Sequence, residues 1–191
     1  RSLFFFFGIS FFLISIYKKN VITVFKTSGT SAMLGGFAMS FSFIAFVFAM
    51  INTSVANVVF IISTQTMFLA IFGYIYLKEK VSLVGFFSIV LAMGGVSIMI
   101  GDSVSSGTLF GNLIALTIPI SFSILVMIVR KNSNLDLVPA IWYASILSLL
   151  YSTFMIDGFN FSNHDILMGF LLGVPQLSFG FICITIGSKT T

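Results

Sequence analysis

The side chains of this sequence that are best placed to bind a solute are polar, uncharged and located inside long apolar segments. Asn57 and Thr64 are seven residues apart, a spacing that puts both on one face of a helix, and Gln65 lies beside them. Gln176 follows Pro175, whose missing N–H leaves a carbonyl one helical turn earlier without its donor. Such groups either satisfy the broken helix itself or bind a polar solute, and both interpretations of Gln176 stay open. These four residues are our first candidates for the lining of a polar cavity.

Trp142 and Tyr143 are neighbouring aromatic residues near one end of another apolar segment. Their position favours anchoring at a membrane interface, where tryptophan and tyrosine concentrate. Lining of the cavity is the alternative, and the pair completes the set of cavity candidates.

The sequence contains no set of residues with the types and spacing needed for catalysis or for binding a metal. No Asp, Glu, Lys, Arg or His lies inside the apolar segments, and no nucleophile has a basic partner nearby. There is also no glycine-rich phosphate loop and no pair of carboxylates. His164 has no second His or Cys close to it, and Cys183 lies in an apolar segment as a small hydrophobic residue. We therefore expect no enzyme activity, no cofactor and no metal.

Two further motifs predict structural roles. Glu79 lies between two lysines at the end of an apolar segment, and this interfacial position favours ion pairing or helix capping over proton coupling. Gly169 and Gly173 form a Gly-x-x-x-Gly pair that lets a second helix approach closely, and Gly180 follows one heptad later. The glycine pattern predicts helix packing.

The elements that carry these residues must be membrane helices, because the composition excludes a water-soluble fold. Of 191 residues, 58% are hydrophobic and 7% are charged, and the mean hydropathy is +1.16. A soluble domain has about a quarter charged residues. The single cysteine excludes an internally disulfide-bonded secreted domain. The net charge of +4 does not indicate a nucleic-acid partner, since membrane topology explains it.

Charged and polar residues divide the chain into apolar segments, and a helix needs roughly 20 apolar residues to cross a bilayer. The predicted fold class is an all-α polytopic membrane helical bundle with about seven transmembrane helices, the first of them short. We place the spans at Ser2–Tyr17, Ala32–Ile51, Val55–Tyr76, Leu83–Ile100, Leu109–Val129, Val138–Ile156 and Ile166–Ile186. The polar stretch 52–54 separates the second and third spans as a tight antiparallel connection.

The basic residues set the orientation of these spans. Apart from Arg1, all Lys and Arg residues lie in alternate connections, at positions 18–26, 78–80, 130–131 and 189. The intervening connections carry His164, Asp102, Asp157 and Asp165 without any Lys or Arg. This positive-inside pattern predicts a multi-pass protein of the cell (inner) membrane whose Lys- and Arg-bearing loops are cytoplasmic.

An internal repeat relates the two ends of the chain. The overlay that places Gly36 on Gly173 also places the first span on 138–154 and the second on 169–188. Equivalent connections then lie on opposite sides of the membrane, as inverted repeats with an odd number of helices require. Two five-helix repeats would occupy 1–101 and 108–191. Because the sequence begins at Arg1, we expect a fragment that lacks about one N-terminal and two C-terminal helices of such a pair.

Several motifs resemble a known family. They are the stretch Asn52–Asn57, the helix end Tyr76–Ser82, and the glycines Gly85, Gly94 and Gly95 that follow it. Together they resemble the first EamA repeat of the drug/metabolite transporter (DMT) superfamily, and the resemblance extends over essentially the whole chain.

The resemblance implies two inverted halves with both termini in the cytoplasm, a second repeat opening at Gly111, and a recurrent structural position at Glu79. One position departs from the family pattern. Members usually carry a proline early in the helix that ends near Glu79, where this sequence has Thr66. We therefore predict that this helix lacks the usual kink.

The resemblance, the repeat and the uncharged candidates together predict a secondary transporter of small organic metabolites such as amino acids, commonly an exporter, that works by alternating access. The spans contain no Lys or Arg, which disfavours a strictly anionic substrate. One alternative is a non-transporting membrane subunit or scaffold whose polar residues only join helices. Another is an intramembrane enzyme with catalytic residues outside this chain. Expected partners are a small-molecule metabolite and the lipid bilayer, with no nucleic acid, and a homodimer stays open.

Overall fold

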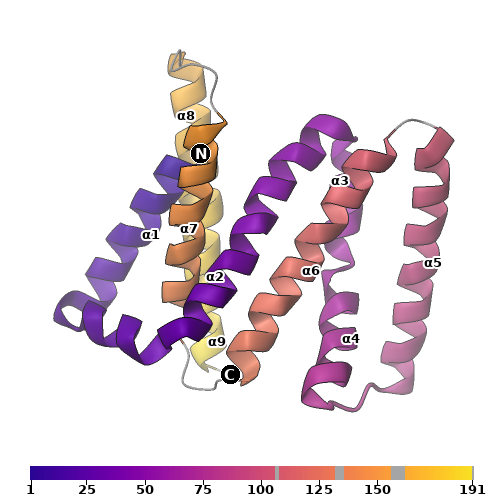
Figure 1. Cartoon of the computed structure of the whole chain (residues 1–191), viewed down its shortest axis with the longest axis horizontal. Helices are drawn as coiled ribbons and strands as arrows, with labels where there is room; N and C mark the ends of the chain where they lie inside the picture. Colours follow the sequence, from indigo (N-terminus) through magenta and orange to yellow (C-terminus); the bar gives the residue numbers. More distant parts are fainter. Residues whose placement is uncertain (106–107, 132–135, 156–161, 191) are drawn as a thin grey trace. The chain divides into compact units, whose positions relative to one another are not determined.

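Helices fill the structure because a chain in lipid must satisfy its backbone hydrogen bonds internally. A computed structural model describes residues 1–105, 108–131, 136–155 and 162–190 (Figure 1). Its helices are α1 (Ser2–Tyr17), the short η1 (Lys18–Asn20), α2 (Val21–Asn52), α3 (Val55–Ser63), α4 (Gln65–Leu77), α5 (Leu83–Ser105), α6 (Leu109–Lys131), α7 (Leu137–Phe154), α8 (Asn163–Leu171), η2 (Leu172–Ser178) and α9 (Phe179–Thr190). The described residues contain no strand.

Among the residues that the structure describes, five helical stretches are long and apolar enough to cross a membrane. They are Val21–Asn52, Val55–Leu77, Leu109–Lys131, Leu137–Phe154 and Asn163–Ile184. Two further apolar stretches, α1 (Ser2–Tyr17) and the part Leu83–Ile98 of α5, correspond to the remaining predicted spans. The predicted all-α polytopic bundle is therefore confirmed. The predicted end of one span at Ile156 lies outside the described residues.

The chain divides into two compact units. The first unit combines Arg1–Ser40 with Asn132–Thr191, and the second is Phe41–Lys131. Each unit combines helices from both predicted repeats. In the first unit α1 packs with α7 and η2, and in the second unit α6 packs with α3 and α4. The repeat boundaries at 1–101 and 108–191 stay a prediction.

In the first unit, α1 and α7 run antiparallel. The Ser2 hydroxyl, at the start of α1, lies 3.1 Å from that of Ser148 and 2.9 Å from that of Ser152, near the end of α7. At the opposite end, the Tyr17 hydroxyl donates a hydrogen bond to Asp136. Asp136 also caps α7 by accepting from the backbone N–H of Val138 at 3.3 Å. Polar groups at both ends thus fix the register of this helix pair.

Gly36 and Gly173, which the repeat overlay pairs, make matching contacts with different helices. A β-carbon at Gly36 would lie 2.6 Å from the carbonyl oxygen of Ala140 in α7 and 2.6 Å from the β-carbon three residues later. A β-carbon at Gly173 would lie 2.8 Å from the carbonyl oxygen of Arg1 and 2.7 Å from the β-carbon three residues later in α1. A glycine of each predicted repeat therefore contacts a helix of the other predicted repeat, an arrangement that inverted repeats would give. Gly180 has no atom this close, so the predicted glycine stripe does not extend to it.

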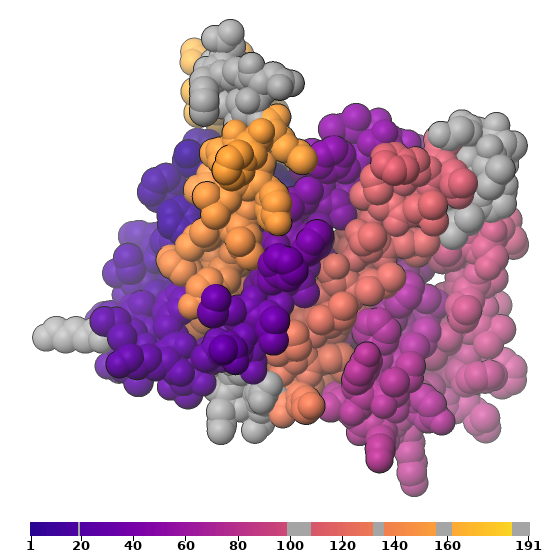
Figure 2. Space-filling view, in the orientation of Figure 1, coloured from indigo at the N-terminus to yellow at the C-terminus, as the bar shows by residue number. Residues whose placement is uncertain are grey.

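In the second unit, small and branched side chains form the core between α2, α3 and α6. Its buried members are Ala45, Ala49, Val58, Ile61, Ala115 and Ile118. The space-filling view shows α6 directly against α4 (Figure 2). The buried Ser42 hydroxyl donates to the Ile118 carbonyl at 3.2 Å, which joins α2 to α6. This packing positions the polar residues at the start of α6.

The expectation of an unkinked helix around Thr66 is wrong. The helical stretch is interrupted at Thr64, whose ψ of 0° separates α3 from α4. The Thr64 hydroxyl donates to the Ile61 carbonyl at 2.6 Å, and its backbone N–H bonds to the same carbonyl at 3.1 Å. A threonine hydroxyl that bonds to its own helix competes with the regular hydrogen-bond ladder, so the interruption needs no proline.

The helix break expected at Pro175 takes a different form. The chain continues from α8 to α9 through η2, a π-helical turn that contains Pro175. The wider turn tolerates the missing N–H, since π-bulges absorb local irregularity inside a helix. The buried Ser178 hydroxyl lies 2.9 Å from the Gly173 carbonyl and 3.3 Å from the Phe5 carbonyl of α1. The turn is thereby joined to α1.

Candidate functional site

The six predicted cavity residues fall into two groups, one in each unit. Asn57, Thr64 and Gln65 belong to the second unit. Trp142, Tyr143 and Gln176 belong to the first.

Asn57 belongs to a hydrogen-bonded cluster with Thr53 and Asn112. The Asn112 side-chain oxygen accepts from the Thr53 hydroxyl at 2.7 Å and from the Asn57 amide at 3.3 Å. The Asn57 amide also lies 3.1 Å from the Thr53 hydroxyl. Asn112 is fully buried, and its amide nitrogen has no hydrogen-bond partner in the described structure. The cluster therefore contains a buried donor without a partner among the described residues.

Close packing of α6 against the α2–α3 turn creates this cluster. A β-carbon at Gly111 would lie 2.6 Å from the Asn52 carbonyl oxygen, so only glycine permits the approach. The Ser54 hydroxyl caps α3 by accepting from the Asn57 N–H at 3.2 Å, which fixes the turn. Thr53 and Asn112 are members of this cluster that were not among the residues predicted from the sequence. The available signal was an amide beside the glycine that opens the predicted second repeat.

Thr64 and Gln65 are not joined to this cluster. Thr64 is buried, and its hydroxyl donates a hydrogen bond to the Ile61 carbonyl at the interruption between α3 and α4. Gln65 is half-buried at the first position of α4. The helix interruption disrupts the regular spacing that placed Asn57 and Thr64 on one face.

Trp142 and Tyr143 form an aromatic cluster with Phe25 in the first unit. Ring centroids lie 5.1 Å apart for Phe25 and Trp142, 5.5 Å for Phe25 and Tyr143, and 5.6 Å for Trp142 and Tyr143, all in edge-to-face orientation. The Trp142 indole nitrogen donates to the Ser10 hydroxyl of α1 at 3.0 Å. A cavity of about 520 Å³ adjoins the cluster, lined by Ser10, Leu13, Ile14, Val21, Phe25, Trp142 and Tyr143. The indole N–H is thus already satisfied within the protein.

Gln176 lies in the π-helical turn η2 and is exposed. No hydrogen bond to its side chain occurs in the part of the chain that the structure describes. The amide therefore makes no bond within the turn that surrounds Pro175, whereas the Ser178 hydroxyl bonds to the Gly173 carbonyl of that turn. Gln176 is not among the lining residues of the cavity beside Trp142 and Tyr143.

Glu79 forms an ion pair with Arg130 at the ends of α4 and α6. The Arg130 guanidinium lies 3.1 and 3.2 Å from the two carboxylate oxygens, and both side chains are about half exposed. Lys78 ends α4 in the left-handed conformation, with φ of 54°, and the Glu79 N–H bonds to the Gly73 carbonyl at 3.2 Å. The small Gly73 admits the carboxylate, because a β-carbon there would lie 2.8 Å from its oxygen. This geometry fits the predicted structural role of Glu79.

We expect Arg130→Gln to lower the stability of the protein by less than about 1 kcal/mol, because solvent screens an exposed ion pair. Thermal unfolding in detergent measures the effect. Lys80→Gln is the matched control, because it removes one positive charge from the neighbouring turn. A much larger loss for Arg130→Gln than for Lys80→Gln would contradict this expectation.

The three glycines of the family motif show no contact with the backbone of another helix. No atom lies within 4 Å of a β-carbon built at Gly94. At Gly95 the nearest atom belongs to the ring of Phe60 at 3.3 Å, and at Gly85 the neighbours lie just before α5. Their structural role in this family motif stays a prediction.

Comparisons with known proteins identify a family for the first part of the chain. The EamA-like transporter family matches residues 2–101. No curated protein and no solved structure matches the chain. The family match includes Asn57 and Glu79, and it ends before α6.

Proposed function

The chain belongs to the EamA-like transporter family of the DMT superfamily, and we propose that it exports small, neutral or zwitterionic organic metabolites such as amino acids. It is a multi-pass membrane protein of a transporter family, which is a class of proteins without enzymatic activity. The substrate class, the direction and the mechanism are parts of the proposal.

The observation that carries the proposed substrate class is the unsatisfied amide of the buried Asn112. A buried donor without a partner is costly, and a substrate with a carbonyl or carboxylate oxygen would satisfy it. Asn57 lies beside Asn112, and both groups are neutral. A neutral amide cluster suits a neutral or zwitterionic solute better than a strictly anionic one, which would recruit Lys or Arg.

Alternating access is supported by the exchange of helices between the repeats. Each compact unit contains helices of both repeats, and α2 passes from one unit to the other. We propose that the units, rather than the repeats themselves, are the bodies that move. Rocking of these bodies would preserve the glycine crossings within the first unit and the Asn112 cluster within the second.

We also propose that the ends of α4 and α6 face the cytoplasm in the inner membrane. The Glu79–Arg130 ion pair joins these helix ends, and both carry additional lysines. Two basic connections of the positive-inside pattern are therefore adjacent, which supports a shared side of the membrane.

We expect simultaneous Asn57→Ala and Gln176→Ala changes to reduce export by about tenfold or more, because loss of the amide contacts weakens substrate binding by roughly 1.4 kcal/mol. The measurement compares metabolites inside and outside bacteria that express the protein with those of a vector control. The matched control is Ser63→Ala, because this hydroxyl is exposed and bonds only to the Phe60 carbonyl of its own helix.

Wild-type export by the double variant would contradict the assignment of these amides. No difference between the wild-type protein and the vector, with folded protein in the membrane, would favour the scaffold alternative. Cysteines at Asn57 and Gln176 distinguish the two functions further. They should react with hydrophilic thiol reagents and be protected by substrate if they line a pathway, and resist them if they are packed.

A further inference from the structure

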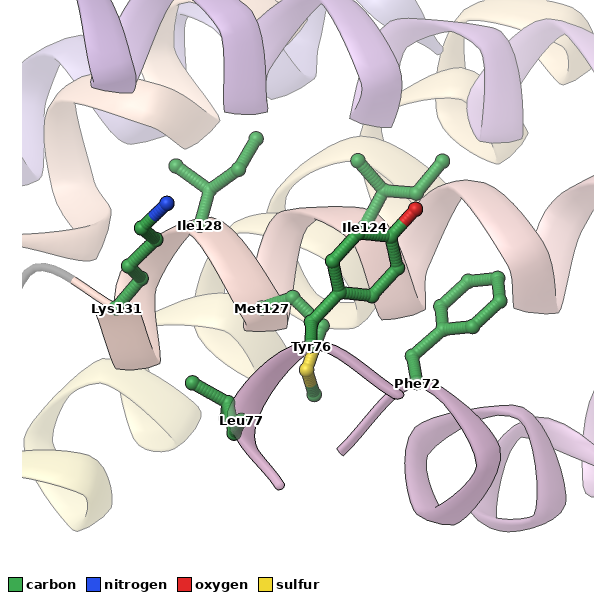
Figure 3. A pocket seen from close by; sticks show the side chains of 7 residues that line it. All are labelled: Phe72, Tyr76, Leu77, Ile124, Met127, Ile128 and Lys131. Carbon is green, nitrogen blue, oxygen red and sulfur yellow. The ribbon is translucent and has the colours of Figure 1, made fainter. Parts of the chain in front are cut away.

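A groove between α4 and α6 has an amphipathic lining that the proposed transport does not use. Its volume is about 360 Å³, and Figure 3 shows the side chains around it. Phe72 of α4 and Ile124 and Ile128 of α6 are apolar lining residues. The polar groups of the lining are the Lys131 amine and the Tyr76 hydroxyl.

The charged group of the groove lies at one end. Lys131 is the last residue of α6, and Figure 3 places it opposite Phe72 with the other side chains between them. Ile124, Ile128 and Lys131 are spaced by four and three residues, so they share one helix face. The face extends about 10 Å from Lys131 to Ile124 at 1.5 Å per residue. The groove therefore has a cation at the helix end and an apolar wall that leads away from it.

The positive charge at this end is not neutralised within the described residues. Arg130 is paired with Glu79, whereas Lys131 makes no hydrogen bond or ion pair in this part of the chain. Lys78 and Lys80 lie in the turn that carries Glu79. The sequence around these two helix ends thus carries four basic residues and one carboxylate, and Lys131 is the basic residue that lines the groove.

The outer surface of α4 is suited to contact with lipid. Tyr74 is 62% exposed, Ile75 58% and Tyr76 73%, so the apolar groove continues into an exposed apolar surface. In a membrane, lipid chains cover such a surface. A ligand at the groove would then need an apolar tail for its wall and an anionic head for Lys131.

We propose that the groove binds one anionic phospholipid, with its phosphate at Lys131 and an acyl chain along Ile124 and Phe72. A phosphodiester with net negative charge complements the excess of lysines, and basic pockets between membrane helices bind such headgroups. A zwitterionic phospholipid provides the same tail without the net charge. That the lipid comes from the cytoplasmic leaflet rests on the proposed orientation of the protein. The lipid site itself does not depend on the proposed transport function.

The test is native mass spectrometry of the purified protein with phosphatidylglycerol or phosphatidylcholine added to the detergent. We expect Lys131→Gln to weaken phosphatidylglycerol binding about fivefold, as loss of one basic contact predicts. Phosphatidylcholine should bind weakly to the wild-type protein, and Lys131→Gln should not change this binding. Lys26→Gln is the matched control, since it removes one exposed lysine of α2 that does not line the groove and should leave phosphatidylglycerol binding unchanged.

A second variant tests the apolar wall without changing the charge. Ile124→Trp places a larger ring at a lining position that is 40% exposed, so it should fill the groove and weaken phosphatidylglycerol binding. Both variants are compared after size-exclusion chromatography shows a monodisperse protein, and inorganic phosphate is added as a competitor without a tail. Competition by phosphate at equal concentration would overturn the lipid proposal in favour of a small-anion site. Wild-type binding by both variants, or an equal loss with Lys26→Gln, would also overturn it.

Discussion

Replacement of Gly36 or Gly173 by alanine is expected to destabilise the protein by about 1–3 kcal/mol, the usual cost of overpacking. The added β-carbon of Gly36→Ala would lie 2.6 Å from the backbone oxygen of Ala140, and that of Gly173→Ala 2.8 Å from the backbone oxygen of Arg1. Backbone atoms in packed helices cannot move aside as a flexible side chain can. Both variants should therefore unfold at lower temperature in detergent and yield less monodisperse protein.

Gly94→Ala is the matched control for these variants. Gly94 also lies in an apolar helix, but no atom is within 4 Å of its added β-carbon. Alanine favours helix over glycine by about 1 kcal/mol, so this variant should be neutral or stabilised. If Gly36→Ala and Gly173→Ala unfold like Gly94→Ala, the glycine crossings do not exist in solution.

Asn112→Leu is expected to lower stability by about 1–3 kcal/mol, since it removes a fully buried acceptor of two hydrogen bonds. The Thr53 hydroxyl and the Asn57 amide would keep only their contact with each other. The branched leucine side chain must also fit beside Gly111, where α6 meets the backbone of Asn52. Thermal unfolding and the yield of monodisperse protein measure the loss.

Asn52→Leu is the matched control, because it removes an amide from the same turn without removing a member of the buried cluster. Asn52 is exposed, and its amide donates only to the Phe48 carbonyl of its own helix at 2.7 Å, so this change should have little effect on stability. Equal stability of Asn112→Leu and Asn52→Leu would contradict a stabilising cluster. Loss of export by Asn112→Leu at wild-type stability would instead assign the Asn112 amide to the substrate.

The polar site could be predicted only in part from the sequence. Asn57 stood out because an amide inside an apolar segment is costly and therefore rare. Its partners could not be identified, because Thr53 lies in a connection and Asn112 is on a helix far along the chain. Thr64 was grouped with Asn57 on the assumption of a regular helix, and its own hydroxyl bond to Ile61 ends that regularity.

The sequence alone predicted the all-α class of the fold and the approximate positions of the apolar spans. In lipid each apolar segment must satisfy its own backbone, so composition and the positions of charges are sufficient to locate spans such as Leu109–Lys131. Only the tertiary structure decided which helices pack together. Between helices in lipid the hydrophobic effect gives no preference, so pairing depends on close approach and on hydrogen bonds. Gly36 against α7, Gly173 against α1 and Thr53 with Asn112 are contacts of this kind, and each joins segments that are distant in sequence.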